Sequence, residues 1–203
     1  MKQPVESGNR RALVMAAYAR IAATGFEGLR TRDVAADVGI NIGTLHYYFP
    51  SKEALIRAVV HHCIGKFAAT LASEGSPAEQ LQAHLEGIRY LLKTDQQQWA
   101  VLSEVSLRAA RDETIAELMR ESQNHWFEFL RGLVARGVAS GSLEPGLHPE
   151  GVAATLIAAI GGVCMPTLRV MQPQRIDQTF DQLERWLGLS IAPYEPADDG
   201  ASL

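Results

Sequence analysis

Residues 31–49 read TRDVAADVGINIGTLHYYF, and this stretch decides the fold. Two short helical segments, 31–38 and 42–49, flank a tight turn at Gly39, where glycine can adopt the positive φ that a sharp bend requires. The positions at which the two helices would touch carry small or apolar residues, namely Ala35, Val38, Ile40 and Leu45. The pattern predicts a helix-turn-helix, a motif that places its second helix in the major groove of DNA.

The second helix of this motif is predicted to present one face to DNA. With Leu45 at the centre of the buried face, Ile42 and Phe49 fall beside it. The opposite face carries the candidate base contacts, which are Gly43, Thr44 and Tyr47. Glycine allows close backbone approach, threonine can bond a base edge or touch a thymine methyl, and tyrosine brings a ring and a hydroxyl. A short aromatic-rich helix can also be plain core, but a helix of this length cannot bury both faces.

Neighbouring residues are candidate phosphate contacts. His46 and Tyr48 flank the exposed face, and Lys52 follows directly after Ser51 at the start of the next helix, whose free amides also favour an anion. The alternative for Lys52 is a solvated side chain without function.

Capping residues predict where the first helices begin. The hydroxyl of Thr31 is expected to cap the helix that follows it, and the side chains of Asn41 and Ser51 are expected to cap the next two. A first helix is expected over 8–24, ended by Gly25.

The rest of the chain also reads as helices, without a convincing alternating run that would indicate a strand. The run Ser76-Pro77-Ala78-Glu79 combines an N-cap, a proline at the first helical position and a capping-box glutamate, so a helix is expected to start there. Further helices are expected to begin at Asp95, Asp112, Pro149 and about Ile176. The chain is therefore predicted to be all-α.

The composition limits the class of protein. The 203 residues are 47% hydrophobic and 21% charged, as in ordinary soluble globular proteins. Cys63 and Cys164 form no Cys-x-x-Cys pair, so neither a disulfide framework nor a zinc site is expected, and the reducing cytoplasm is the predicted location. Residues 1–60 hold eight Lys or Arg against five Asp or Glu, so a net charge of +3 stands against −7 on the remainder. A positive N-terminal third suits contact with a polyanion.

Two stretches imitate membrane signals. Arg10 and Arg11 precede an apolar run that Arg20 ends early, which favours an amphipathic first helix over a secretion leader. Residues 151–168 carry no charge, but their Ala, Gly and Thr content favours a buried helix at a protein interface over a membrane span. No contact with a membrane is expected.

No motif indicates catalysis. His61, His62 and Cys63 are consecutive, so on a helix their side chains point about 100° apart and cannot converge on one metal ion without a distant partner. Glu104 and Arg108 stand four residues apart and are expected to form a surface ion pair. We therefore expect a protein that is not an enzyme and that needs no metal or other cofactor.

Residues 25–35 (GFEGLRTRDVA) and 38–55 (VGINIGTLHYYFPSKEAL) closely resemble the N-terminal domain of tetracycline-repressor-like (TetR family) transcriptional regulators. One departure is His46, where the family usually has a tyrosine. Thr31 and Arg32, within the matching stretch, join the candidate DNA contacts. The resemblance implies a homodimer with its N-terminal helices on DNA, its last two helices in the dimer interface, and a small-molecule pocket in its C-terminal domain.

The resulting organisation has four parts. A helix-turn-helix domain covers residues 1–50, and a connecting helix covers 51–73. An effector-binding and dimerisation domain covers 76–190, and a disordered tail covers 191–203.

Polar or polarizable residues on otherwise apolar stripes are the candidate effector contacts. They are His84, Trp99, Ser103, Met119, Ser122 and Trp126. The alternative for each is a satisfied core residue, because a buried hydroxyl or imidazole usually finds a local hydrogen bond. A loose likeness to the multidrug and choline-responsive branches of the family surrounds Trp99 and 111–112 and names no ligand. The composition of the set favours a mostly apolar or aromatic effector, neutral or weakly charged.

The last two predicted helices carry the candidate dimer interface. Ala154, Ala158 and Gly162 recur at four-residue spacing on the uncharged helix. The last helix contributes Phe180, Leu183 and Leu187, so an apolar patch would be left for a second copy to cover.

These features together predict a transcriptional regulator, namely a repressor that a small effector releases from a palindromic operator. A helical ligand carrier and an effector-independent DNA-binding protein are the alternatives.

Overall fold

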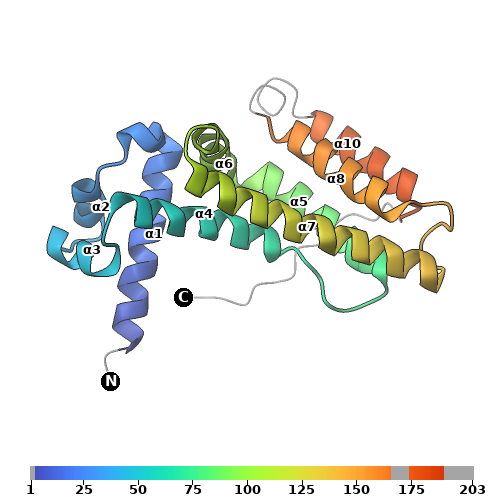
Figure 1. The fold of residues 1–203 in the computed structure, drawn as a ribbon, viewed down its shortest axis with the longest axis horizontal. Helices are drawn as coiled ribbons and strands as arrows, with labels where there is room; N and C mark the ends of the chain where they lie inside the picture. The colour runs from blue at the N-terminus through green and yellow to red at the C-terminus, as the bar shows by residue number, and fades with distance from the viewer. Residues whose placement is uncertain (1–2, 166–173, 190–203) are drawn as a thin grey trace.

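The computed structural model describes residues 3–165 and 174–189, and this part of the chain is built from α-helices joined by loops (Figure 1). The predicted all-α class is confirmed. The helices are α1 (Gln3–Gly28), α2 (Thr31–Asp37), α3 (Ile42–Tyr48), α4 (Lys52–Ala68), α5 (Pro77–Thr94), α6 (Gln96–Ala109), α7 (Glu113–Ser140), α8 (Pro149–Val163) and α10 (Gln174–Leu187). The tail expected over 191–203 lies outside the described residues.

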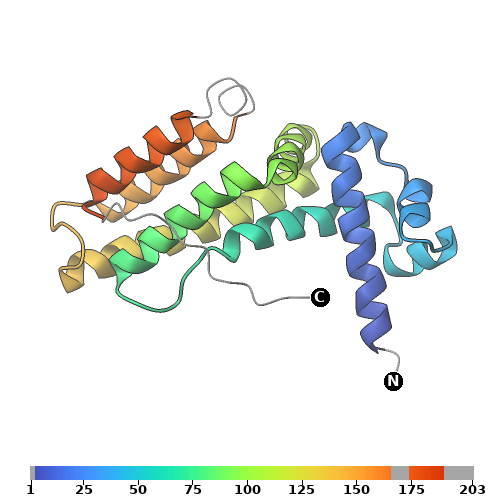
Figure 2. The same ribbon diagram turned by 180° about the vertical axis from the view of Figure 1, so that it is seen from behind.

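The helices form a head and a body. The head, α1 to α3, stands at one end of an elongated molecule, and the body comprises α5 to α8 and α10 (Figure 1). α4 leads from the head into the body, while α8 and α10 lie side by side at the end far from α3, as the reverse view also shows (Figure 2).

Two hydrophobic cores match this division. The first joins α1, α2 and α3 to α4, where Val59, Val60 and Cys63 are fully buried, and it also takes in Val101 and Val105 of α6. The second core fills the body between α5, α6, α7, α8 and α10. Because α6 contributes to both cores, apolar packing ties the head to the body.

Most of the predicted helix starts are confirmed by their caps. The Asn41 side chain accepts the amide N–H of Thr44 at 2.8 Å, and Ser51 accepts that of Ala54 at 3.2 Å. The predicted capping box of α5 is complete, and Asp95 and Asp112 cap α6 and α7. The position of every one of these caps follows from side chains within three residues of the helix start.

Thr31 was expected to be a cap, and this prediction is wrong. The carbonyl of Arg30 accepts the amides of Asp33 and Val34, so Arg30 occupies the N-cap position, without a side-chain bond, and Thr31 is the first helical residue.

Gly25 breaks the first helix at the predicted place. Its φ of 69° and ψ of −179° lie in a region that is nearly exclusive to glycine, and the chain turns there into a last helical segment that ends at Gly28. Gly39 in the helix-turn-helix likewise has a φ of 70°. Both bends therefore depend on the missing Cβ.

Candidate DNA interface and effector site

α3 packs against the rest of the head through one face. Leu45 is fully buried and Phe49 is 2% exposed, as the helical wheel predicts. On the opposite side Gly43 is exposed and Tyr47 is 72% exposed, so most of the Tyr47 side chain faces solvent. Ile42 was expected on the buried face but is 36% exposed, because it is the first residue of α3 and lies beyond the contact that Leu45 and Phe49 fill.

Contacts with Tyr48 and Asn41 orient two side chains of this exposed face, Tyr47 and Thr44. The half-buried Tyr48 ring meets the Tyr47 ring edge-on, with 5.2 Å between centroids, and so supports it. The Thr44 hydroxyl donates to Asn41 Oδ1 at 3.2 Å, which leaves its lone pairs and its methyl group for a base edge.

The remaining predicted DNA contacts surround this face unevenly. His46 and Arg32 are exposed, and Thr31 is half-buried. The ammonium of Lys52 donates to the Phe26 carbonyl at 3.1 Å, which ties the start of α4 to the end of α1 and leaves two further N–H groups on the same nitrogen.

Sequence reasoning missed one cation beside α3. The exposed guanidinium of Arg10, near the start of α1, lies over the Phe49 ring at 5.1 Å from the centroid. Its charge was visible in the sequence, but only the packing of α1 against the end of α3 brings it to this surface.

The orientation of α2 is held by an ion-pair cluster. Arg20 of α1 bonds both carboxylate oxygens of Asp37 and also reaches Asp33 at 3.4 Å. The hydrogen bond from Arg20 lowers the pKa of Asp37, so this carboxylate is charged under ordinary conditions.

In the body, the predicted effector residue His84 is a fully bonded core side chain. The indole N–H of Trp126 donates to its Nε2 at 2.8 Å, so the ring proton sits on Nδ1, which donates to the Thr70 hydroxyl oxygen at 2.7 Å. The Thr70 hydroxyl in turn donates to the Phe67 carbonyl at 2.7 Å. Burial lowers the pKa of His84 to about 4, so the ring is neutral.

Three aromatic side chains meet next to this chain of bonds. Phe67 of α4 packs edge-on against Trp99 of α6, with 5.4 Å between centroids, and lies 6.1 Å from the ring of Trp126 of α7. Trp99 is 1% exposed, and its indole N–H donates to the Leu91 carbonyl. We call Phe67, Trp99, Trp126 and His84 the aromatic cluster.

The structure brings together only part of the predicted effector set. His84, Trp99 and Trp126 belong to the aromatic cluster, and the Ser103 hydroxyl donates to the Trp99 carbonyl. Met119 packs instead against the core shared by the head and α4. Ser122 is half-buried on α7, one turn before Trp126.

Phe67 was not predicted, because it lies on the connecting helix. Its partners Trp99 and Trp126 are distant in sequence, so only the folded chain brings the three rings together.

The expected ion pair between Glu104 and Arg108 is not formed. Arg108 pairs with Asp112 at 3.2 Å, and a Glu104 oxygen accepts the amide N–H of Phe26 at 3.3 Å. The bend at Gly25 lies close to α6 and leaves the amide N–H of Phe26 without a partner inside the helix. The Glu104 carboxylate accepts this N–H and is therefore not paired with Arg108.

The predicted dimer residues divide into two groups. Ala154 and Ala158 of α8 are exposed and Gly162 is half-buried, whereas Phe180, Leu183 and Leu187 of α10 are at most 4% exposed within the protomer. These three side chains belong to the body core, so they do not form the exposed apolar patch that was expected of them. The apolar stripe of an amphipathic helix packs first against its own domain.

The surface over α8 and α10 carries other apolar groups. Trp186 is 63% exposed and Met165 is 56% exposed. Trp186 lines a groove of about 390 Å³ together with Leu183 and Leu187 of α10 and with residues at and just before the start of α8, among them Leu147 and Gly151.

Two expectations concern sites of other kinds. Within residues 3–165 and 174–189, no three His, Cys, Asp or Glu side chains are grouped so that they could hold a metal ion. None of the helices in the same ranges combines the length and the apolar character needed to cross a bilayer.

Comparison with known proteins agrees with this geometry. The family model of bacterial regulatory proteins of the tetR family matches residues 13–59, and the model of the BetI-type transcriptional repressor C-terminal domain matches residues 77–188. The HTH-type transcriptional regulator RutR of Escherichia coli O157:H7 is 30% identical over 141 residues, which cover 68% of this chain and 66% of that protein. The match thus spans just under two thirds of this relative.

Solved structures share the fold. A TetR transcriptional regulator from Chloroflexus aurantiacus J-10-FL has a TM-score of 0.76 and 22% identity, with 90% of this chain and 95% of that chain covered. A putative transcriptional regulator from Saccharomonospora viridis in complex with choline has a TM-score of 0.74 and 22% identity, covering 89% and 95%. At such identity these two similarities establish the fold alone.

The family models cover both the helix-turn-helix and most of the body, and the relatives are regulators rather than enzymes. The chain therefore belongs to the TetR family of DNA-binding transcriptional regulators, with a C-terminal domain of the BetI type.

Proposed function

We propose that this regulator is a repressor that binds a palindromic operator as a homodimer and leaves it when a small, mostly apolar or aromatic effector binds the body. The division proposed is the one expected from sequence, with DNA binding in residues 1–50, the connection in 51–73, and effector binding and dimerisation in 76–190. The exposed face of α3 carries the proposal. We place this DNA-binding regulator in the cytoplasm.

The DNA-binding surface supports an insertion of α3 into the major groove. Gly43 and Thr44 would bring the backbone near the base edges, and the exposed Tyr47 ring would contact a base or a thymine methyl. Phosphate contacts are assigned to Lys52, Arg32 and Arg10. Thr31, His46 and Tyr48 lie at the margins of the same surface.

A gel shift tests this assignment of the α3 face to DNA binding. The DNA is an operator that the full-length protein selects from random sequences. Replacing Tyr47 by Ala should weaken operator binding about five- to a hundred-fold, since a good base contact is worth roughly 1–3 kcal/mol. Leu107→Ala, which removes a side chain of similar exposure (69%) from the body, is the control and should leave affinity unchanged. Indifference to both Tyr47→Ala and Thr44→Ala would refute the assignment.

The proposed effector site is the aromatic cluster. An effector seated among its rings would find apolar contacts, and the neutral His84 would give no charge to an anion. Aromatic faces also attract quaternary ammonium groups, and the Saccharomonospora viridis neighbour binds choline, so a compact organic cation is the second effector class.

Tryptophan fluorescence can identify the effector class. The chain has three tryptophans, and Trp186→Phe leaves only Trp99 and Trp126, both in the aromatic cluster. Aromatic acids, neutral aromatics and choline are titrated into this variant with and without operator DNA. A true effector quenches the emission saturably and binds less tightly in the presence of operator, since the coupling between the sites is reciprocal. Equal affinity in both cases would leave an effector-independent DNA-binding protein or a carrier.

A further inference from the structure

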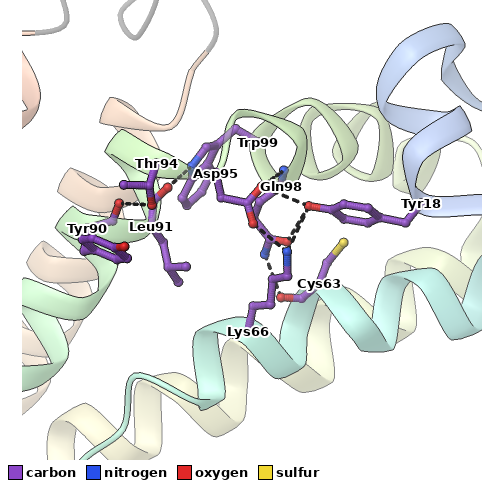
Figure 3. Close-up of polar contacts among 9 residues, drawn as sticks. All are labelled: Tyr18, Cys63, Lys66, Tyr90, Leu91, Thr94, Asp95, Gln98 and Trp99. Atoms are coloured by element: carbon purple, nitrogen blue, oxygen red, sulfur yellow. Dashed lines mark hydrogen bonds and ion pairs between the residues drawn. The ribbon is translucent and has the colours of Figure 1, made fainter. Parts of the chain in front are cut away.

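Tyr18 is a residue of α1 whose side chain reaches out of the head. It is 1% exposed, and its hydroxyl lies 3.3 Å from Asp95 Oδ1 and 3.4 Å from Gln98 Oε1, at the start of α6 (Figure 3). Burial first, and then the negative charge of Asp95, raise the pKa of Tyr18, so its hydroxyl keeps the proton that it donates.

α4 completes this group of contacts. Lys66 donates to the Tyr18 hydroxyl at 3.3 Å and to Asp95 Oδ2 at 2.6 Å, and its ammonium lies 4.7 Å from the centroid of the Tyr18 ring. The Gln98 amide donates to the Cys63 carbonyl of α4 at 2.8 Å. We call Tyr18, Lys66, Asp95 and Gln98 the Tyr18 clasp. It joins the head, the connecting helix and the body at one point (Figure 3).

The Tyr18 clasp and the aromatic cluster are carried by the same two helices, α4 and α6. Lys66 precedes Phe67 on α4, and Gln98 precedes Trp99 on α6, so each helix contributes adjacent residues to both groups. The Leu91 carbonyl accepts both the indole N–H of Trp99 at 3.1 Å and the amide N–H of Asp95 at 2.9 Å. A displacement of Trp99 therefore acts on the same carbonyl that positions Asp95.

Polar contacts differ from apolar packing in one relevant way. Apolar packing tolerates small rotations, because it depends on buried area and not on direction. Hydrogen bonds weaken steeply with angle and distance, so a buried set of them defines one arrangement of the helices that carry it.

We propose that the four residues of the Tyr18 clasp are positioning residues that set the angle of the head on the body, and hence the half-site spacing that the dimer accepts. The inference rests on the proposed function.

The operator selected by the full chain provides the test. Its two half-sites are moved apart or together by one and two base pairs, and binding is measured by gel shift for each spacing. The wild-type protein should lose about ten-fold or more per altered base pair, because half-site spacing is matched to the distance between the two reading helices.

Tyr18→Phe removes the hydroxyl and keeps the ring against His62 and Lys66. We expect nearly unchanged affinity for the selected operator and a flatter profile, with a loss of only about two- to three-fold per altered base pair. Asp95→Asn keeps a side chain that can cap α6, removes the charge facing Lys66, and should flatten the profile in the same way. Tyr90→Phe, a hydroxyl removal on α5 of the body, is the matched control and should keep the wild-type profile.

The outcomes separate the two proposals. If both Tyr18→Phe and Asp95→Asn keep the steep spacing profile of the wild-type protein, the proposed role of the Tyr18 clasp is wrong, and the proposed function is unaffected. A wild-type protein that selects no spaced palindrome would overturn both. A loss of thermal stability without a change in the spacing profile would make the Tyr18 clasp a structural contact only, and would also refute the proposal.

Discussion

His84 shows how burial selects one state of a titratable side chain. Its two ring nitrogens are bonded to Trp126 and Thr70, which suits the neutral ring, and burial holds its pKa at about 4. In the unfolded chain His84 takes up a proton near the ordinary histidine pKa of about 6.5, whereas in the folded chain it stays neutral until the pH approaches 4. The stability that His84 contributes is therefore complete above about pH 6.5 and is lost as the pH falls toward 4.

We expect His84→Gln to remove this pH dependence. The wild-type free energy of unfolding should fall by about 3 kcal/mol more between pH 7 and pH 4 than that of the variant, from a pKa difference of about 2.5 at 1.36 kcal/mol each. Urea unfolding followed by circular dichroism measures both slopes.

His125→Gln, at an exposed position of α7, is the control and should follow the wild-type slope. Equal slopes for His84→Gln and wild type would mean that His84 takes up its proton at the same pH in the folded and the unfolded chain.

At the scale of elements, the corner between α1 and α2 depends on its glycine. The amide N–H of Phe26 donates to Glu104 of α6, and the Phe26 carbonyl accepts from Lys52 of α4. A Cβ added at Gly25 would lie 2.8 Å from the Glu104 carboxylate, and the φ of 69° would strain any other residue. Three helices thus converge on a bend that only glycine makes without strain.

Gly25→Ala should therefore lower the free energy of unfolding by about 1–3 kcal/mol, the cost of a residue held in a region of φ and ψ reserved for glycine. Chemical denaturation measures the loss. Gly8→Ala in the same helix, where a Cβ would meet no atom within 4 Å, should instead leave stability equal or raise it by about 0.5–1 kcal/mol. If Gly25→Ala and Gly8→Ala changed the free energy of unfolding equally, the bend at Gly25 would not depend on its glycine.

At the scale of the whole molecule, the end remote from α3 remains open to a second copy. Ala154 and Ala158 present small side chains that let another helix approach closely, and Trp186 and Met165 add exposed apolar area. An isolated protomer would expose this surface to water, so pairing of two copies would bury it. We expect a C2 dimer with one head at each side.

Ala158→Arg should abolish this dimer, because a guanidinium would be buried against the same residue of the partner near the two-fold axis. Light scattering should give the monomer mass, and operator affinity should fall by about a hundred-fold or more, since one head makes only half of the contacts. Ala139→Arg at an exposed position of α7 is the control. An unchanged dimer mass for Ala158→Arg would place the interface elsewhere.

Local signals in the sequence determined the all-α class, most helix starts and the two sides of α3. The caps at Asn41, Ser51 and Ser76 and the bend at Gly39 depend on atoms within a few residues, so pattern and spacing suffice to predict them. The burial of Leu45 opposite the exposed Tyr47 follows in the same way from helical periodicity.

Only the tertiary structure decided which helix faces meet. Phe180 turned into the body core, Glu104 bonded Phe26 instead of Arg108, and Tyr18 reached Asp95, 77 residues away in the chain. An amphipathic pattern states that a helix has an apolar face but not which helix covers it, because burial is non-directional. The partner of a polar group is chosen only once packing has brought distant helices within hydrogen-bond range, and this separates what the sequence determined about this protein from what its folding decided.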